Sequence, residues 1–127
     1  MPVQEADRKI VETVFQAMHE RADGRDKMVS LFAADAELTE PFSGESKTHK
    51  GLEAIGAFFD GAVANMPPDM TIKMDRIDLD GDRVRADWTC TSKAFGGPMK
   101  GHDLYRIVGG KIVNAEFVVT EMPSMGQ

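Results

Sequence analysis

Apolar residues in the first half of the chain recur at helical spacing. One stripe, from about residue 5 to residue 22, consists of Ile10, Val11, Val14, Phe15, Met18 and Ala22, and it predicts an amphipathic helix. Asp23-Gly24 interrupts the stripe, and a second short helix is expected to start at Asp26 as its N-cap, with Met28, Leu31 and Phe32 facing inward. A third helix follows Gly51 and ends before Pro67-Pro68, because proline disfavours helical geometry in the residue before it.

Strand patterns occupy the rest of the chain. A short strand is predicted from Ala36 to Glu40, stopped by Pro41, and a second one at residues 47–50 after a turn. From Met70 onward the apolar period changes to two, and short glycine-containing links separate expected strands at 70–79, 82–95, 99–108 and 111–120. Helices followed by an antiparallel meander indicate an α+β fold with the helices packed on one face of the sheet.

The alternation within each strand predicts which side chains face the core. In the last strand the inward set is expected to be Val113, Ala115, Phe117 and Val119. In the strand at 82–95 the corresponding set is Val84, Ala86, Trp88 and Cys90. In the strand between them Asp103 shares one face with Tyr105 and Ile107, so its carboxyl is expected to point into an apolar concavity. Such a carboxylate must be paired, hydrogen-bonded or protonated, and burial raises its pKa toward the range of a general acid or base.

Composition and charge narrow the function classes. The 127 residues fit a single domain, 1–127, and the net charge of -6 without a basic run argues against nucleic-acid binding. One cysteine allows no internal disulfide, and no apolar stretch approaches the ~20 residues that a membrane span needs. We therefore expect a soluble, cytoplasmic protein with no membrane partner. The three histidines lack the spacing of a zinc site, so we expect neither a metal nor a cofactor.

Two segments resemble a known superfamily. GHDLYRIVGGKIVNAEF, residues 101–117, is similar to the ending of SnoaL-like proteins, which belong to the nuclear transport factor 2-like superfamily. FAADAELTEPFSG, followed by His49, Gly51 and LEAIGAFF, resembles the corresponding stretch of bacterial ketosteroid isomerases in the same superfamily. The resemblance implies a cone-shaped α+β barrel, with three N-terminal helices packed on a strongly curved, mostly antiparallel sheet around a pocket. It also implies a homodimer.

The same resemblance implies roles for two acids. The position of the isomerase general base matches Glu40, and the position of a second, protonated acid that donates to the substrate's oxyanion matches Asp103. In SnoaL-like cyclases the Asp103 position resembles the acid/base residue of an aldol ring closure. The isomerase tyrosine on the first helix is absent, because the matching region is Phe15-Gln16, and Tyr105 is the candidate to replace it. The expected substrate contacts are Tyr105, Phe59, Trp88, Phe117, Val119, Phe15, Gln16 and His49.

Three functions remain open at this point. The first is a cofactor-independent isomerase or polyketide cyclase that moves protons on a small hydrophobic carbonyl compound. The second is a non-catalytic ligand-binding or dimerisation module with the same pocket. Epoxide hydrolysis, the third, needs an inward-facing arginine, and the strand pattern provides none.

Overall fold

The computed structural model describes residues 5–42 and 45–121. In chain order the elements are α1 (Glu5–His19), a 3₁₀ turn η1 (Arg21–Gly24), α2 (Arg25–Ser30), β1 (Phe32–Glu40), β2 (Lys47–Lys50), α3 (Gly51–Asn65), β3 (Thr71–Asp80), β4 (Arg83–Thr91), β5 (Met99–Val108) and β6 (Lys111–Glu121). The three predicted helices and six predicted strands are therefore all present. The β2 strand and the β5 strand have the predicted bounds.

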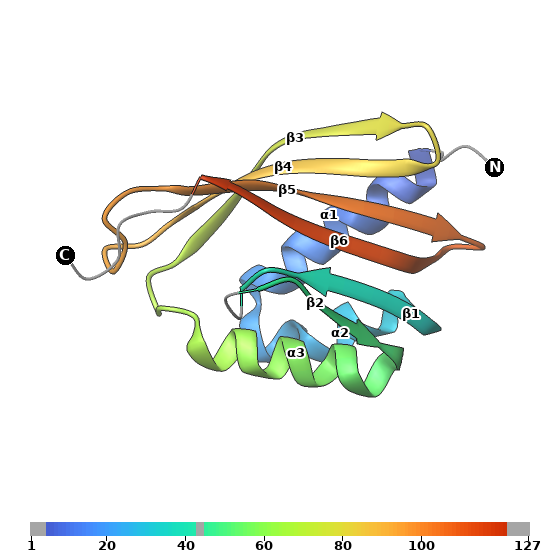
Figure 1. The fold of residues 1–127 in the computed structure, drawn as a ribbon, viewed down its shortest axis with the longest axis horizontal. Coiled ribbons are helices and arrows are strands. Elements are labelled where there is room, and N and C mark those ends of the chain that lie inside the picture. Colours follow the sequence, from blue (N-terminus) through green and yellow to red (C-terminus); the bar gives the residue numbers. More distant parts are fainter. Residues whose placement is uncertain (1–4, 43–44, 122–127) are drawn as a thin grey trace.

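One curved sheet carries the whole architecture. Its strand order is β2-β1-β6-β5-β4-β3, and every pairing is antiparallel except that of β1 with β6. The sheet does not close on itself, since β2 and β3 remain its two edges. In Figure 1 α3 lies below β1 and β2, whereas α1 crosses behind the longer strands. The predicted α+β fold, a cone of three helices on a curved and mostly antiparallel sheet, is confirmed.

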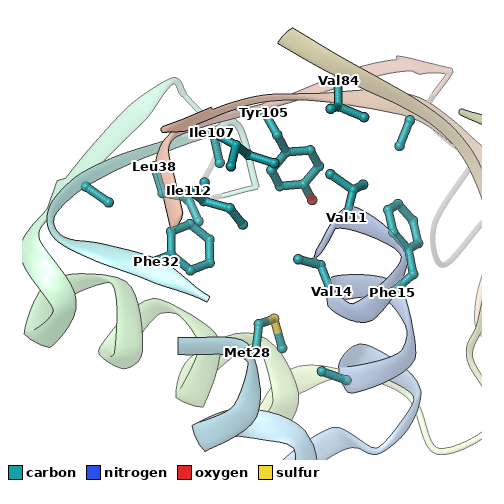
Figure 2. Close-up of a cluster of buried hydrophobic side chains, with 14 of the residues drawn as sticks. Val11, Val14, Phe15, Met28, Phe32, Leu38, Val84, Tyr105, Ile107 and Ile112 are labelled. Atoms are coloured by element: carbon teal, nitrogen blue, oxygen red, sulfur yellow. The ribbon is translucent and has the colours of Figure 1, made fainter. Parts of the chain in front are cut away.

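The core lies between the concave face of the sheet and the helices. From α1, Val11, Val14 and Phe15 are buried, and from α3 Ile55 and Phe59 are buried. Figure 2 shows these α1 side chains facing apolar side chains of the sheet, with Tyr105 projecting from the sheet into the same cluster. The predicted helix stripes therefore bury their apolar faces against the sheet, which is the main source of helix stability in a protein of this size. None of the helices in the described ranges is long and apolar enough to cross a membrane.

The start of the second helix differs from the prediction. Gly24, not Asp26, is the N-cap residue of α2, and no side chain caps this helix. The reason is that η1 runs directly into α2 with helical backbone angles, so Asp26 lies exposed inside the first turn. Ala22 falls in η1 and is exposed, and β1 begins at Phe32, four residues before the predicted start.

The predicted inward faces are confirmed in β4 and β5, and the prediction is wrong at one position of β6. Asp103, Tyr105 and Ile107 are buried on β5, and Val84, Ala86, Trp88 and Cys90 are buried on β4. On β6, however, Ile112 is fully buried whereas Val113 is only partly buried. A register shift explains this, because Arg106 pairs with Asn114 while the next residue, Ile107, pairs with Ile112. The extra residue of this bulge turns Val113 out of the inward set. The β4 strand also ends at Thr91, not at residue 95.

Candidate active site

A cavity of about 710 Å³ lies between the helices and the concave face of the sheet. Its wall takes side chains from α1, α3 and five of the six strands. Most of the wall is apolar, and its polar groups include the carboxyls of Glu40 and Asp103, the hydroxyl of Tyr105 and the amide of Asn65. Two acids on a mostly apolar wall are the chemically distinctive feature of this cavity.

Asp103 is held by two neutral hydrogen-bond donors. The indole Nε1–H of Trp88 donates to Oδ1 at 2.8 Å, and the hydroxyl of Tyr105 donates to Oδ2 at 2.7 Å. The Asp103 residue is only 7% exposed. No ion pair to Asp103 occurs within residues 5–42 and 45–121, so its negative charge has hydrogen bonds but no cation beside it.

This environment changes the acidity of the carboxyl. Burial raises the pKa of Asp103 to about 7, and the bonds from Tyr105 and Trp88 oppose that rise without cancelling it. The charged form is costly in an apolar wall, and two neutral donors recover only part of the lost hydration. Burial also raises the pKa of Tyr105 well above its usual range, and the adjacent Asp103 charge adds to this effect. Asp103 can therefore gain or lose a proton near neutral pH, whereas Tyr105 keeps its proton.

The position of Trp88 depends on a glycine in the neighbouring strand. Gly101 lies opposite Trp88 in the β4–β5 ladder, and Asp103 lies two residues further along β5. A Cβ atom on residue 101 would lie 2.7 Å from Cζ2 of the indole, closer than real Cβ contacts. The missing side chain thus leaves room for the indole over β5, where it reaches Asp103.

Glu40 is held differently from Asp103. It is 3% exposed, its Oε1 accepts from the backbone N–H of Phe42 at 2.6 Å, and its Oε2 lies 2.9 Å from Nε2 of His49. The His49 side chain is 14% exposed, and its ring packs on Phe58 with centroids 5.1 Å apart. The β1–β2 pairing brings the two residues together, because Glu40 pairs with Lys47 and His49 follows two residues later on the same side of β2. His49 does not line the cavity, and its contact with the site is the one to Glu40.

The two acids lie on either side of one aromatic residue. Phe117 on β6 pairs with Asp103 on β5. On the other side of β6, Thr39 pairs with Glu116, which places Glu40 next to Phe117. Adjacent strands are about 4.8 Å apart, so the backbones at Glu40 and Asp103 are roughly 10 Å apart. A ligand that contacts both carboxyls must therefore lie across Phe117.

The other predicted contact residues divide into two groups. Phe15, Phe59, Trp88, Tyr105 and Phe117 line the cavity. Gln16 is exposed and Val119 is partly buried, and neither lines the cavity. Gln16 lies outside the apolar stripe that Val11, Val14 and Phe15 form on α1, so its side chain is exposed.

Several wall residues were not among the expected substrate contacts. Ala62 and Met66 extend the face that Phe58 and Phe59 begin on α3, at the three- and four-residue spacing that a helix stripe requires. Phe95 comes from the β4–β5 connection, where alternation gives no guidance, and Met99 is the first residue of β5. Cys90 lines the wall as well, and burial raises the pKa of its thiol to about 11, so it stays protonated at neutral pH.

A metal centre is not formed by the described residues. Within residues 5–42 and 45–121, no three or more His, Cys, Asp or Glu side chains come together in a way that could hold a metal ion. Glu40 and His49 form a pair and not a larger cluster.

Comparison with known proteins identifies the family. Residues 11–115 match the model of the SnoaL-like domain, so the chain belongs to the SnoaL-like family. No curated protein matches the sequence. The fold is shared with a SnoaL-like protein of unknown function from Burkholderia thailandensis, at a TM-score of 0.77 and 18% identity over 95% of this chain and 100% of that one.

Two further structures carry suggested activities. One is a proposed ketosteroid isomerase from Kribbella flavida, with a TM-score of 0.73 and 16% identity over 100% of this chain and 87% of that one. The other is a proposed polyketide cyclase from Sinorhizobium meliloti, with a TM-score of 0.71 and 22% identity over 86% of this chain and 93% of that one. At these identities the likeness shows the shared fold alone.

Proposed function

We propose that this protein is a cofactor-independent enzyme of the isomerase or cyclase type, which transfers protons on a small apolar carbonyl compound. The observation that carries this proposal is the carboxyl of Asp103 in an apolar wall, held by Trp88 and Tyr105, with a pKa raised to about 7. A carboxyl with a pKa near the working pH is suited to general acid–base catalysis, because both of its protonation states are populated.

The proposed reaction begins with the removal of a proton next to the carbonyl. The Glu40 carboxylate takes a proton from the α-carbon, the electron pair of the C–H bond forms a carbon–carbon double bond, and the π pair of the carbonyl moves onto its oxygen to give an enolate. The protonated form of Asp103 donates a hydrogen bond, or its proton, to that oxygen. In an isomerisation Glu40 then returns its proton to a different carbon as the carbonyl forms again, and any proton that Asp103 gave to the oxygen goes back to Asp103. In a cyclisation the enolate carbon attacks a second carbonyl of the same molecule, and the alkoxide that forms takes the proton held by Glu40.

The arrangement of the two acids supports this division of roles. Glu40 has His49 and the Phe42 N–H beside it, so each of its carboxyl oxygens has a polar partner. Burial favours the protonated form of Asp103 that an oxyanion requires, and the hydrogen bonds from Trp88 and Tyr105 oppose this effect only in part. An elongated apolar ligand lying across Phe117 would bring its carbonyl to Asp103 and its acidic carbon toward Glu40.

Ligand binding without turnover is the second candidate function. Two observations favour it: the first helix offers Phe15 and exposed Gln16 where the related isomerases carry a tyrosine, and the hydroxyl of Tyr105 is already bonded to Asp103. A missing oxyanion donor typically costs about 100-fold or more in rate. In this reading Asp103 would serve to anchor a ligand hydroxyl or carbonyl.

Deuterium exchange separates the two functions without knowledge of the natural substrate. A panel of apolar cyclic ketones in D₂O is followed by proton NMR, with and without enzyme, for loss of the α-proton signals. We expect catalysed exchange for at least one ketone, and a reduction of about 100-fold or more in Asp103→Asn and in Glu40→Gln. Asp87→Asn on β4 and Glu37→Gln on β1 are matched controls, because both residues alternate away from the buried sets of their strands. Ketone binding without exchange in the wild-type protein would reject the enzyme in favour of the binding module.

A further inference from the structure

The connection between α3 and β3 forms part of the cavity wall and also reaches solvent. In this segment, residues 66–70, the cavity is lined by Met66, Pro67 and Met70, whereas Pro68 and Asp69 are exposed. We call these five residues the rim loop. Its position defines one side of the cavity where the wall meets the surface.

The rim loop is fixed to the sheet by Asp69. The two carboxylate oxygens of Asp69 accept hydrogen bonds from the hydroxyl of Ser92 at 2.7 Å and from the backbone N–H of Lys93 at 2.8 Å. These bonds join the rim loop to the β4–β5 connection, which supplies Phe95 to the same wall. One side of the rim loop is therefore attached to the sheet.

Arg21 fixes the rim loop from the helical side. Its guanidinium Nη2 donates to the carbonyl oxygens of Pro68 and Met70, both at 3.0 Å, across 47 and 49 residues of sequence. A planar guanidinium can serve two acceptors with one rigid group, which the flexible ammonium of a lysine does less well. Arg21 is thus the side chain that joins the connection between α1 and α2 to the cavity wall.

The backbone of Arg21 is unusual. Its φ angle is +57°, and among the described residues it is the one non-glycine residue with a positive φ. An L-residue in this left-handed region costs conformational energy and persists where surrounding interactions hold it. Such residues cluster at functional sites and ligand clamps. The observed angle and the two hydrogen bonds are independent observations that point to the same residue.

We propose that Arg21 is a positioning residue that holds the rim loop in place, and thereby controls which apolar ligands enter the cavity and how fast they leave. Met66 and Met70 have flexible side chains that adapt to many shapes, so selectivity at this side of the wall depends on a fixed backbone. Without Arg21 the rim loop keeps its side-chain attachment through Asp69 and the backbone hydrogen bond from Met66 N–H to the Val63 carbonyl. The inference rests on the proposed ligand binding in this cavity, but not on proton transfer.

Trp88 provides a readout of access to the cavity. It is the single tryptophan of the chain, it lines the cavity, and it is 6% exposed. Acrylamide quenching of its fluorescence therefore reports how easily a small neutral molecule enters. We expect a higher quenching constant in Arg21→Ala and in Arg21→Gly than in the wild type. Arg8→Ala is the matched control, because Arg8 is an arginine of α1 that forms a 3.9 Å ion pair with Glu5 on the same helix.

A neutral fluorescent probe, N-phenyl-1-naphthylamine, tests ligand release directly. Two lost hydrogen bonds correspond to an expected increase of about tenfold in its dissociation rate, measured by stopped-flow dilution. The glycine variant separates two causes: it relieves the positive φ and still lacks the side chain, so it must behave like Arg21→Ala and not like the wild type. Arg21→Lys should be intermediate.

The outcomes that would overturn this inference are specific. The inference is wrong if the quenching constants of Arg21→Ala and Arg21→Gly equal that of Arg8→Ala, whether or not N-phenyl-1-naphthylamine binds. It is also wrong if this probe leaves the glycine variant at the same rate as it leaves the wild type. Loss of deuterium exchange plays no part in these measurements, so failure of the proposed catalysis and failure of the proposed positioning role are distinguishable. The glycine variant fits the backbone angle and provides the test if Arg21→Ala does not fold.

Discussion

The indole Nε1–H of Trp88 donates a 2.8 Å hydrogen bond to Oδ1 of Asp103 inside the concave face of the sheet. The two residues lie on adjacent strands, and the bond runs diagonally past Gly101. Together with the hydroxyl of Tyr105 it gives Asp103 two fixed neutral donors and no cation in the described part of the chain. Burial therefore raises the pKa of Asp103, and the two hydrogen bonds lower it. A substitution can remove each hydrogen bond separately.

The first prediction concerns Tyr105→Phe. This change removes one donor from the Asp103 carboxylate and keeps the aromatic ring that packs against Phe117 at 6.3 Å. A hydrogen bond to a charged group contributes about 1.5–3 kcal/mol, so the pKa of Asp103 should rise by about one unit or more. Carbon-13 NMR of aspartate-labelled protein measures the titration. An unchanged or lower pKa would contradict the assigned role of the hydroxyl.

A second prediction concerns the close packing at Gly101. In Gly101→Ala the new Cβ would meet the Trp88 ring at 2.7 Å and also the backbone carbonyl of Val118. We expect a loss of about 1–3 kcal/mol in the free energy of unfolding, and a red shift of Trp88 emission as the indole leaves its place. Gly97→Ala is the control, because a Cβ atom on residue 97 would meet nothing within 4 Å. Urea denaturation and fluorescence spectra measure both effects, and equal behaviour of the two variants would refute the packing argument.

The third prediction is a pH dependence of stability that comes from Asp103. Its pKa is about 7 in the folded chain and about 4 for an aspartate in an unfolded chain. Between these values the folded state holds a proton that the unfolded state has released, so the free energy of unfolding falls as pH rises through this window.

The expected size follows from the same two values. Three pKa units correspond to roughly 4 kcal/mol, and this loss is complete once the pH exceeds about 7. The Asp103→Asn variant has no such titration. As pH rises from about 4 to about 7, the wild type should therefore lose stability relative to the variant. Urea denaturation at a series of pH values measures it. A difference that does not vary between pH 4 and 7 would mean that the Asp103 pKa is not raised.

The fourth prediction concerns His49 as a positioning residue for Glu40. His49→Phe keeps an aromatic ring on Phe58 but loses the 2.9 Å contact with Glu40, whereas His49→Gln can still donate a hydrogen bond. We expect the catalysed deuterium exchange to fall by about tenfold in the phenylalanine variant, with partial recovery in the glutamine variant. Thr48→Val is the control, since Thr48 bonds to Thr39 outside the cavity wall. Equal rates in all three variants would exclude this role.

Much of the fold followed from periodicity, and the exceptions have local causes. Alternation predicted the inward faces of β4 and β5 because both strands pair regularly in that region, from Val84 opposite Tyr105 to Cys90 opposite Met99. It failed at Val113, where a bulge opposite Arg106 and Ile107 adds one residue to β6. Nothing in the sequence around Val113 marks that bulge.

The sequence predicted which residues of the candidate site face inward, but it did not predict the hydrogen bonds between them. Placing Asp103, Tyr105 and Trp88 on inward faces required only strand parity. Their hydrogen bonds depend on the diagonal offset between β4 and β5 and on the space above Gly101, which a single sequence does not reveal. Arg21 was not singled out at all, because its partners are backbone carbonyls 47 and 49 residues away and leave no side-chain signature.

The most direct measurement is the pKa of the Asp103 carboxyl itself, by carbon-13 NMR titration of aspartate-labelled wild-type protein, with Asp103→Asn used to assign the signal. A midpoint near 7 is expected, because burial outweighs the two hydrogen bonds. A midpoint at or below about 4, the range of an exposed aspartate, would contradict the proposed acid–base chemistry.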